Sequence, residues 1–536
     1  MHVAVVGSGP AGLSCANALL LRGYRVTILD VAEQLDAPIK KIVDDLRGTD
    51  PAQWSRKVMD VLRANPTLAT GGIPKKFYFG SDFVYAADRP YAPLDVTGTS
   101  AVPTNAQGGY STVWGAALLP TADCDLTGWP LTREDLAPYY ADILAEMPLC
   151  AGDDPLLTEF PLFKEHPGNL DPGIQGNRLL DDLLRAGSTL ARRGTLFGRP
   201  RLAVHVTDAG AESLGCVYCG LCLSGCPRGS IYSTVPQLES LVRRGAINYL
   251  PGVHVEHVAE RDDQTIVSFT RTATGERIEQ AYDAVFVGAG PINTTRILLA
   301  SRNMLDQPVT LLESQKFLIP VLRLNDSPGA LEDRNVTLAS AFLETKIPDI
   351  SDHWIHVQLS AVNEMVLRSL GMDSERPSLR KLMLGPALRR LMVAWCGLHS
   401  DHSSRLVLTL RSGMRNGRHE LAIHGELSAA AKQISKRVAK SLFSLGWSFR
   451  SAFLFPLIRF SDPGTGTHCG GAFPMSLAPR GELESDLFGR PFGWTRIFAI
   501  DSTIFPSIPG TTIALTVMAN ARRIGATAPV RELARA

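Results

Sequence analysis

The chain has 536 residues, and its 54 Lys and Arg against 53 Asp and Glu leave a formal net charge of +1. Hydrophobic residues make up 45% and charged residues 20%, which excludes a disordered chain. The neutral charge balance excludes the electrostatic attraction that most nucleic-acid-binding proteins use. No apolar stretch approaches the roughly 20 residues that span a bilayer. A predicted strand follows the first residue directly, so we expect a cytoplasmic protein without a signal peptide.

A Gly-rich turn lies between a predicted strand and a predicted helix near residue 10. The apolar stretch 2–6 is followed by Gly7-Ser-Gly9-Pro-Ala-Gly12, and a second predicted strand, 24–29, ends at Asp30. This order and spacing is the fingerprint of a dinucleotide-binding unit, in which a helix amino terminus binds a pyrophosphate. We expect the three glycines to make the turn and admit the cofactor, and Asp30 to bind a ribose hydroxyl. The position at the start of the chain favours FAD over NAD.

The next chemical pattern is the stretch Gln107-Gly-Gly-Tyr-Ser-Thr-Val-Trp-Gly115. Its paired glycines, Gly108 and Gly109, permit close approach of the backbone to a planar ring. The stretch resembles the flavin-contact region of the glucose–methanol–choline (GMC) oxidoreductases, most of all the pyranose-oxidase branch. In that branch a histidine that carries covalent flavin falls where this chain has Val113. The resemblance therefore implies FAD that is bound without a covalent link.

Three further segments are similar to the same family, so the resemblance spans the chain. They are residues 129–140, with a helix cap predicted at Thr132; residues 281–301, which include Gly290; and residues 466–520, which include His468 and Asp501. The family's architecture implies an α/β (α+β) protein, with a Rossmann-like FAD-binding domain and an antiparallel-sheet substrate domain. The implied FAD contacts are Gly7, Gly9, Gly12, Asp30, Gly108, Gly109, Gly290 and Asp501.

The same resemblance divides the chain into three parts. Residues 1–300 are the first part of the FAD-binding domain, 301–462 the substrate-binding domain, and 463–536 the closing part of the FAD-binding domain. In the substrate domain we predict strands at 317–323, 354–359, 405–410 and 420–424, which would form one antiparallel sheet over the flavin. Residues 365–398 are apolar with interleaved arginines, Arg376 among them. This pattern favours two amphipathic helices that close the active site, over a pair that docks on a membrane surface or a partner.

Oxidation of an alcohol requires a base for the hydroxyl proton while hydride passes to the flavin. Histidine suits this role because its ordinary pKa of about 6.5 lies near neutral pH. By resemblance His468 is the catalytic base. The family offers a second His or Asn where this chain has Thr512, with Thr511 one residue away. Since a hydroxyl orients a substrate but is no base near neutral pH, we expect His468 to act alone and Thr512 to position the substrate.

Four cysteines crowd into eleven residues, within an insertion near 205–235. Cys216, Cys219, Cys222 and Cys226, followed by Pro227, have the C-x2-C-x2-C-x3-C-P spacing of bacterial ferredoxins. The hypothesis is an iron–sulfur cluster, 4Fe–4S or 3Fe–4S, with Cys226 folded back as the fourth ligand or with Cys124 or Cys150 in its place. The alternatives are a zinc knuckle, or a cysteine-rich turn that supports the flavin domain.

Together these patterns predict an FAD-dependent enzyme that oxidises a hydroxyl group of a sugar, an aminosugar or aminoglycoside, or a similar polyol. The expected partners are that small-molecule alcohol and an electron acceptor, either oxygen or a redox protein. Nucleic acid is not expected, and peripheral membrane contact is the less favoured reading. Two alternatives remain: an electron-transfer flavoprotein whose working part is the cysteine cluster, and a flavin-dependent reductase on the same scaffold.

Overall fold

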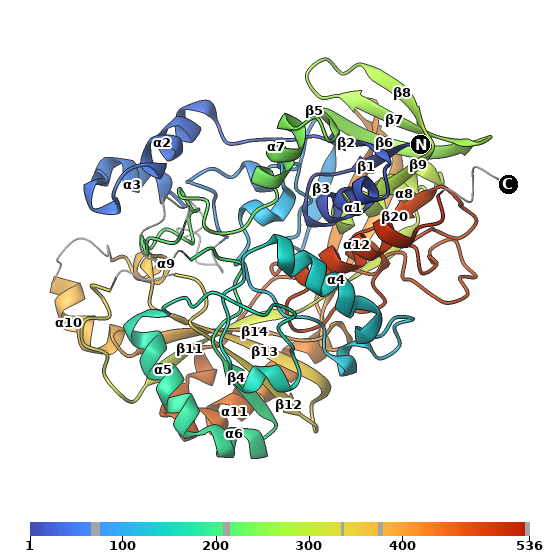
Figure 1. Cartoon of the computed structure of the whole chain (residues 1–536). Coiled ribbons are helices and arrows are strands. Elements are labelled where there is room, and N and C mark those ends of the chain that lie inside the picture. The colour runs from blue at the N-terminus through green and yellow to red at the C-terminus, as the bar shows by residue number, and fades with distance from the viewer. Residues whose placement is uncertain (66–74, 207–214, 334–336, 373–378, 531–536) are drawn as a thin grey trace.

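The structure is a computed structural model that describes residues 1–65, 75–206, 215–333, 337–372 and 379–530 (Figure 1). Its strands form one parallel sheet and three antiparallel or mixed sheets. Within the described ranges, no helix combines the length and the apolar character needed to cross a membrane.

The parallel sheet gathers strands from both ends and the middle of the chain. Its order is β20-β9-β1-β2-β5, and all neighbouring pairs are parallel. The bounds are β1 His2–Val6, β2 Arg25–Asp30, β5 Asn248–Pro251, β9 Ala284–Val287 and β20 Ile497–Ala499. β1 and β9 are apolar almost throughout, as expected for parallel strands that are covered on both faces. The predicted Rossmann-like unit is confirmed, and its last strand comes from near the carboxyl end.

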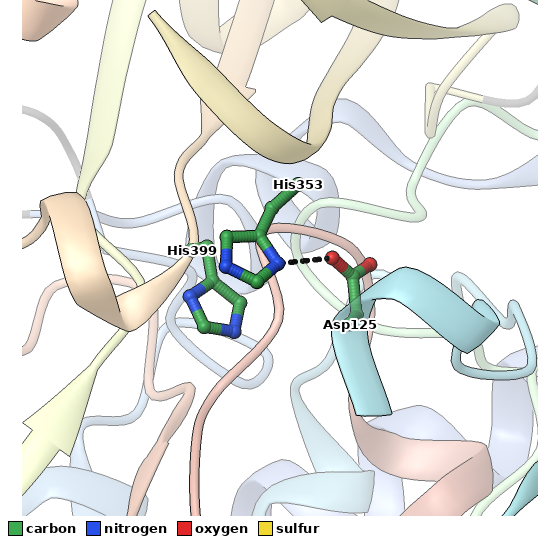
Figure 2. A group of neighbouring side chains, drawn as sticks. All are labelled: Asp125, His353 and His399. Carbon is green, nitrogen blue, oxygen red and sulfur yellow. Dashed lines mark hydrogen bonds and ion pairs between the residues drawn. The ribbon is translucent and has the colours of Figure 1, made fainter. Parts of the chain in front are cut away.

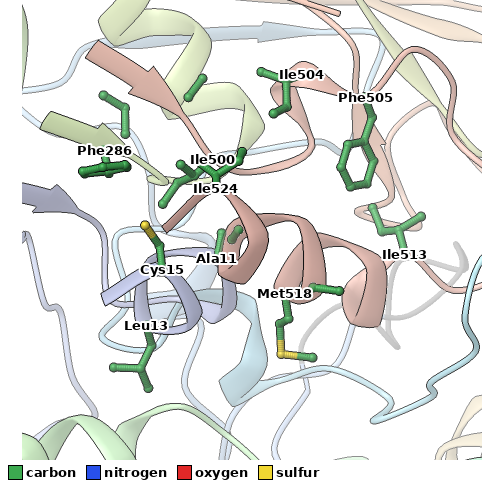
Figure 3. Packing of buried hydrophobic residues seen from close by; sticks show 14 of the residues in the cluster. Ala11, Leu13, Cys15, Phe286, Ile500, Ile504, Phe505, Ile513, Met518 and Ile524 are labelled. Atoms are coloured by element: carbon green, nitrogen blue, oxygen red, sulfur yellow. The ribbon is translucent and has the colours of Figure 1, made fainter. Parts of the chain in front are cut away.

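Helices α1 (Pro10–Leu21) and α12 (Ala514–Thr527) pack against each other beside this sheet (Figure 3). The two helices are so close at Gly525 that a Cβ atom there would lie 2.8 Å from the carbonyl oxygen of Cys15, so this position requires glycine. Met518 and Ile524 of α12 are buried there together with Ala11 and Cys15 of α1. Burial of a large apolar side chain contributes about 1.5–3 kcal/mol, so this contact holds the two ends of the chain in one core.

A three-stranded antiparallel sheet continues from β5. It consists of β6 (Val253–Arg261), β7 (Gln264–Arg271) and β8 (Arg277–Tyr282), in that order. The chain then enters β9 and, after the Gly288–Gly290 turn, helix α8 (Pro291–Ser301). This is the strand, turn and helix that the sequence predicts at 281–301.

The remaining strands form two larger sheets. One has the order β19-β10-β15-β16-β3, and the other β17-β11-β14-β13-β12-β4 with β18 paired to β11. The first contains β3 Leu94–Thr97, β10 Pro308–Glu313, β15 Arg405–Arg415, β16 Arg418–Glu426 and β19 Cys469–Gly470. The second contains β4 Thr195–Gly198, β11 Lys316–Arg323, β12 Ala341–Ile347, β13 Ser351–Ala361, β14 Leu391–Gly397, β17 Ser451–Phe453 and β18 Arg459–Phe460. Helices α5 (Gly173–Arg185) and α11 (Ala429–Gly446) cover the second sheet, and their leucines share its core (Figure 1).

The other helices lie around these sheets. They are α2 Ala37–Arg47, α3 Arg56–Leu62, α4 Arg133–Glu146, α6 Gly187–Arg192, α7 Val235–Arg243, α9 Glu364–Ser369 and α10 Leu379–Leu388. Short 3-10 helices are η1 Pro51–Gln53, η3 Phe83–Tyr85, η4 Gly109–Thr112, η5 Asp123–Leu126, η6 Pro155–Thr158, η7 Ser400–His402, η8 Trp447–Phe449, η9 Phe455–Leu457 and η10 Ser502–Ile504. The cap predicted at Thr132 is present, since its Oγ1 accepts the N–H of Asp135 and the Asp135 carboxylate accepts the N–H of Thr132.

The predicted fold class and the four predicted substrate-domain strands are confirmed, but their assignment to one sheet is wrong. β11 and β13 belong to the second large sheet, whereas β15 and β16 form a hairpin in the first. Strand patterning shows which face of a strand is buried and not which strand lies beside it, because pairing is set by contacts between distant segments.

The expectation of two helices over residues 365–398 is also only half right. Helices α9 and α10 are present, but 391–397 is strand β14, which lies between β11 and β13 in the sheet. The arginines before β14 gave the segment a helical pattern. Along β14 itself, half-buried and buried residues alternate, as in a strand. Arg376 falls outside the described residues. The domain boundaries at 300 and 462 stay predictions.

Candidate functional site

A cavity opens at the carboxyl edge of the parallel sheet. Its wall includes the residues that directly follow three of the strands, Gly7 after β1, Val31 after β2 and Gly288 after β9, and Asp501 shortly after β20. Ligands of open α/β sheets bind at this edge, where the loops diverge. The cavity is therefore the candidate cofactor site.

The Gly-rich turn forms one end of the cavity. Gly7 has a φ of +96°, and a Cβ there would lie 2.6 Å from the carbonyl oxygen of Gly288. A Cβ on Gly12 would lie 2.0 Å from the carbonyl oxygen of Gly7, so only glycine lets α1 start this close to β1. Helix α1 begins at Pro10 without a side-chain cap, which leaves the N–H groups of its first turn for an anion. The turn has the geometry of a phosphate-binding site.

Asp30 at the end of β2 lies on the cavity wall and is buried. Its Oδ2 accepts hydrogen bonds from Ser8 Oγ and, at 3.2 Å, from the Tyr249 hydroxyl. Burial raises the pKa of Asp30 to about 6, although these hydrogen bonds work in the opposite direction. A carboxyl group in this state gains from further donors, and the hydroxyl groups of a ribose would supply them.

Asp501, after β20, forms another part of the wall. Thr294 Oγ1 donates to its Oδ2 at 2.5 Å, and the Thr503 N–H donates to its Oδ1 at 2.9 Å. Burial raises the pKa of Asp501, and the hydrogen bonds lower it. Gly290 stands beside it at the start of α8 with a φ of +84°. These contacts bind the closing segment of the chain to α8.

Two buried polar atoms on the cavity wall lack a partner in the described part of the chain. They are Asn105 Nδ2 and His254 Nδ1. Burial and the neighbouring Arg296 lower the pKa of His254 to about 3, so its ring is neutral. Because buried polar groups are normally satisfied, these atoms fit a bound molecule with polar edges. The sequence reasoning missed Asn105, His254 and Arg296. The only local signal was a lone histidine, His254, in the apolar first half of β6.

Six of the eight residues predicted to bind FAD line this cavity. They are Gly7, Gly9, Asp30, Gly109, Gly290 and Asp501. Gly12 and Gly108 stand behind the wall instead. Gly12 packs against Gly7, and the N–H of Gly108 donates to Ser8 Oγ at 2.9 Å. Binding of FAD by these residues stays a prediction.

His468 lies one residue from the cavity wall, to which Thr467 belongs. Its side chain is partly buried, its carbonyl oxygen accepts the N–H of Ser314 at 3.0 Å, and β19 begins directly after it. Its Nδ1 is buried without a hydrogen-bond partner in the described structure. Burial lowers the pKa of His468 well below its ordinary value, and positive charge at Lys316 and His356 acts in the same direction. The ring is therefore neutral near pH 7, as a base must be.

Lys316 is a buried cation beside this histidine that the sequence reasoning missed. Its Nζ donates to Ser314 Oγ at 2.9 Å and to the carbonyl oxygen of Gly510 at 3.3 Å. Burial lowers its pKa to about 8, against an opposing effect of Glu313. Burial also raises the pKa of Glu313 to about 7, while its carboxylate accepts the N–H of Gly464. Lys316 thus connects the segment that holds His468 to the loop before Thr511.

The two adjacent threonines differ in what their hydroxyl groups contact. Thr512 Oγ1 accepts the N–H of Leu119 at 2.7 Å. Thr511 Oγ1 is buried and has no partner among the described residues, and the backbone of Thr511 interacts with the ring of His468. Neither threonine is on the cavity wall, although Ile513 is. A role for Thr512 toward the substrate stays a prediction.

The four clustered cysteines line a second cavity, and Cys226 folds back to join the other three. None of the four is part of a disulfide in the described structure. The N–H of Ser230 donates to Cys226 Sγ at 3.2 Å. Burial raises the pKa of Cys216 and of Cys219 to about 12, with smaller contributions from the neighbouring thiols.

Neither remote cysteine lies on the wall of this second cavity. Cys150 Sγ donates to the carbonyl oxygen of Val204 at 3.1 Å, and Cys124 lies beside Asp125. Tetrahedral zinc, with bonds of about 2.3 Å, holds its sulfurs about 3.8 Å apart. In the described ranges one group of metal-ligating side chains has its ligand atoms within 4.8 Å of one another, and it is not the cysteine group.

Comparisons with known proteins support the Rossmann-like unit and the overall fold. Residues 5–54 match the family model of an NAD(P)-binding Rossmann-like domain. No curated protein matches the sequence. Pyridoxine 4-oxidase from Mesorbium loti is structurally similar over 98% of both chains, with a TM-score of 0.56 and 13% identity. The chain therefore shares the overall fold of this structure. An FAD-dependent oxidoreductase from Chaetomium thermophilum, solved with a bound fragment, is similar over 98% of both chains, with a TM-score of 0.55 and 14% identity.

Proposed function

We propose that this protein is an FAD-dependent oxidoreductase that oxidises an alcohol to an aldehyde or ketone. The observation that carries the proposal is the cavity at the carboxyl edge of the parallel sheet. The Gly-rich turn, with the geometry of a phosphate-binding site, lies at one end of it, and His468 lies next to its wall. The names of the two similar structures, a pyridoxine oxidase and an FAD-dependent oxidoreductase, support the same class of chemistry. Val113 offers no atom for a covalent flavin link, so FAD would be held without one.

The residues would hold FAD in a definite orientation. The first turn of α1 would face the pyrophosphate, and Asp30 would accept from a ribose hydroxyl group. Asn105 and His254 would then obtain the polar partners that they lack. When bound, FAD supplies a hydride acceptor for the carbon that carries the hydroxyl group.

His468 would take the hydroxyl proton. Its Nδ1 has no hydrogen-bond partner among the described residues and would have a lone pair available for that proton. Lys316 helps to keep the ring neutral and therefore ready to accept a proton. Thr512 would orient the substrate oxygen through its hydroxyl proton, because one of its lone pairs is already used by Leu119.

The substrate that we propose is a hydroxyl group on a sugar, an aminosugar or a related polyol, on the basis of the pyranose-oxidase-like segment at 107–115. The test is anaerobic bleaching of the bound flavin by a panel of sugars, aminosugars and polyols. His468→Ala should abolish bleaching by the active alcohol and leave bleaching by dithionite intact. His424→Ala, at an exposed position, is the matched control. If His468→Ala bleaches at the wild-type rate, His468 is not the base.

We also propose an iron–sulfur cluster in the cysteine cavity, because all four cysteines of the ferredoxin-type run line one enclosed space. Such a cluster would pass electrons from the flavin to a redox protein and make the enzyme a dehydrogenase. Anaerobically purified protein should contain iron and acid-labile sulfide, and Cys219→Ser should lose both but keep FAD. Protein with no iron or sulfide, or with zinc in this cavity, would contradict the cluster and leave the flavin chemistry standing.

A further inference from the structure

A group of histidines and carboxylates lies away from both cavities, at the junction of three segments (Figure 2). Asp125 belongs to η5, His353 to β13, and His399 immediately precedes η7. Asp125 is fully buried, His399 is 2% exposed, and the two imidazole rings are stacked with their centroids 3.5 Å apart. One ligand atom from each of the three residues lies within 4.8 Å of the other two.

Asp401 fixes the orientation of both rings from one side. Its carboxylate lies 3.2 Å from His353 Nε2 and 3.3 Å from His399 Nδ1. The opposite nitrogen of His353, Nδ1, lies 3.1 Å from Asp125 Oδ1, and Figure 2 shows this carboxylate pointing at the ring. Carboxylates that hold the far nitrogens of histidines are the usual outer partners of metal-binding histidines.

Two atoms of this group are buried and have no hydrogen-bond partner in the described part of the chain. They are Asp125 Oδ2 and His399 Nε2. The Nδ1 of His399 either accepts the N–H of Asp401 at 3.2 Å or donates to its carboxylate. Its Nε2 stays unsatisfied in either tautomer, which is costly for a buried polar atom. Donation from Nδ1 leaves a lone pair on Nε2, the state in which a histidine binds a metal.

We propose that Asp125, His353 and His399 bind a divalent transition-metal ion, with zinc as the best match, and that Asp401 supports the two histidines. Two imidazoles and a carboxylate suit zinc, whereas magnesium and calcium prefer sites made entirely of oxygen. Zinc bonds of about 2.0–2.2 Å place ligand atoms about 3.4 Å apart, so the distances between the ligand atoms, which are within 4.8 Å, would shorten by at most about 1.4 Å on binding. Asp401, whose side chain is 60% exposed, lies on the solvent side of the group.

The ion would have a structural role. Ser507 Oγ lies 3.5 Å from the carbonyl oxygen of Asp125, and the backbone of Ile508 exchanges hydrogen bonds with Ser400, at 2.8 Å and 3.0 Å. The metal group therefore backs the 507–510 loop, whose Gly510 accepts from Lys316. Binding would hold η5, β13 and η7 against the loop that leads to Thr511.

Zinc titration of the metal-free, flavin-containing full chain tests the proposal, with the bound ion counted by elemental analysis. The titration is done on the Cys216→Ser, Cys219→Ser background, so that thiols do not bind the added zinc. We expect one zinc ion per chain and a rise in the thermal midpoint. Asp125→Asn and His399→Gln should each abolish this binding, and Asp401→Asn should weaken it by about 10–100-fold. His402→Gln, whose ring lies 6.3 Å from that of His353, should bind as the parent does.

Retained flavin shows that each variant is folded. If Asp125→Asn or His399→Gln loses its flavin, the exposed Asp401→Asn change carries the test. The proposal is wrong if the parent binds no zinc, if Asp401→Asn binds it as tightly as the parent, or if His402→Gln loses it to the same extent.

Discussion

The backbone N–H of Gly108 donates a hydrogen bond to Ser8 Oγ at 2.9 Å, across one hundred positions of sequence. The same hydroxyl donates to Asp30, and the carbonyl oxygen of Ser8 accepts from Thr234 Oγ1 at 2.8 Å. Ser8 thus occupies a variable position of the Gly-rich turn and joins the turn to the second Gly pair, to the acidic end of β2 and to the segment before α7. It positions the proposed flavin contacts relative to one another.

Ser8→Ala should therefore weaken FAD binding, although Ser8 is not one of the motif's glycines. The change leaves the buried N–H of Gly108 without its acceptor and Asp30 without a donor, a cost of about 1–3 kcal/mol. FAD affinity, followed by flavin fluorescence, should fall by about tenfold or more. Ser448→Ala, in the 3-10 helix η8, where Ser448 Oγ donates to the carbonyl oxygen of Leu445, should bind FAD as the wild type does. Equal affinities of the Ser8 variant and wild type would contradict this role.

Thr512→Val should lower stability and raise KM together. Valine removes the acceptor of the buried Leu119 N–H, which costs about 1–3 kcal/mol and should lower the thermal midpoint. It also removes the hydroxyl proton that we propose orients the substrate. Thr512→Ser keeps the hydroxyl and should restore both properties. A rise in KM for Thr511→Val but not for Thr512→Val would assign the orienting hydroxyl to Thr511 instead.

Lys316→Met should move the acid limb of flavin reduction to higher pH. Lys316 is one cause of the lowered pKa of His468, so its removal should bring that pKa back toward 6.5. A base with a higher pKa is protonated, and inactive, over a wider acid range. Stopped-flow reduction by the active alcohol from about pH 4.5 to 8 measures the shift, with the exposed Lys432→Met as control. An acid limb that does not move would mean that Lys316 exerts no field on His468.

Glu313→Gln should become more stable than wild type as the pH rises. The folded-state pKa of Glu313 is about 7 against an ordinary 4.5, so its contribution to stability is complete below about 4.5 and is lost as the pH rises through 7. This difference between the two pKa values corresponds to a loss of about 3 kcal/mol in the free energy of unfolding between about pH 4.5 and pH 8. The glutamine side chain would keep a carbonyl acceptor for the N–H of Gly464 without this loss. Thermal midpoints of both proteins at about pH 5 and pH 8 give the comparison, and parallel pH dependences would contradict it.

Local patterns were sufficient for much of the fold. The order of strand, Gly-rich turn, helix and acidic residue is encoded within about thirty residues, because each step depends on sterics or periodicity of neighbouring residues. The cap at Thr132 follows from a three-residue spacing in the same way. The placement of β14 could not be predicted like this, since a strand in the centre of a sheet is identified by its two neighbours, and those neighbours lie at 316–323 and 351–361.

The sequence by itself determined the nucleotide-type turn at Gly7–Gly12, the parallel βαβ unit and the ferredoxin-type spacing of the cysteines, because these depend on short-range geometry. Tertiary structure alone decided that Lys316 lies beside His468, that Ser8 bonds to Gly108, and that Asp125, His353 and His399 meet. Each of these groups comes from separate strands or loops. Its members are brought together by the burial of apolar surface in the sheets around them, and a lone Lys, Ser or His carries no local sign of the partner that packing will give it.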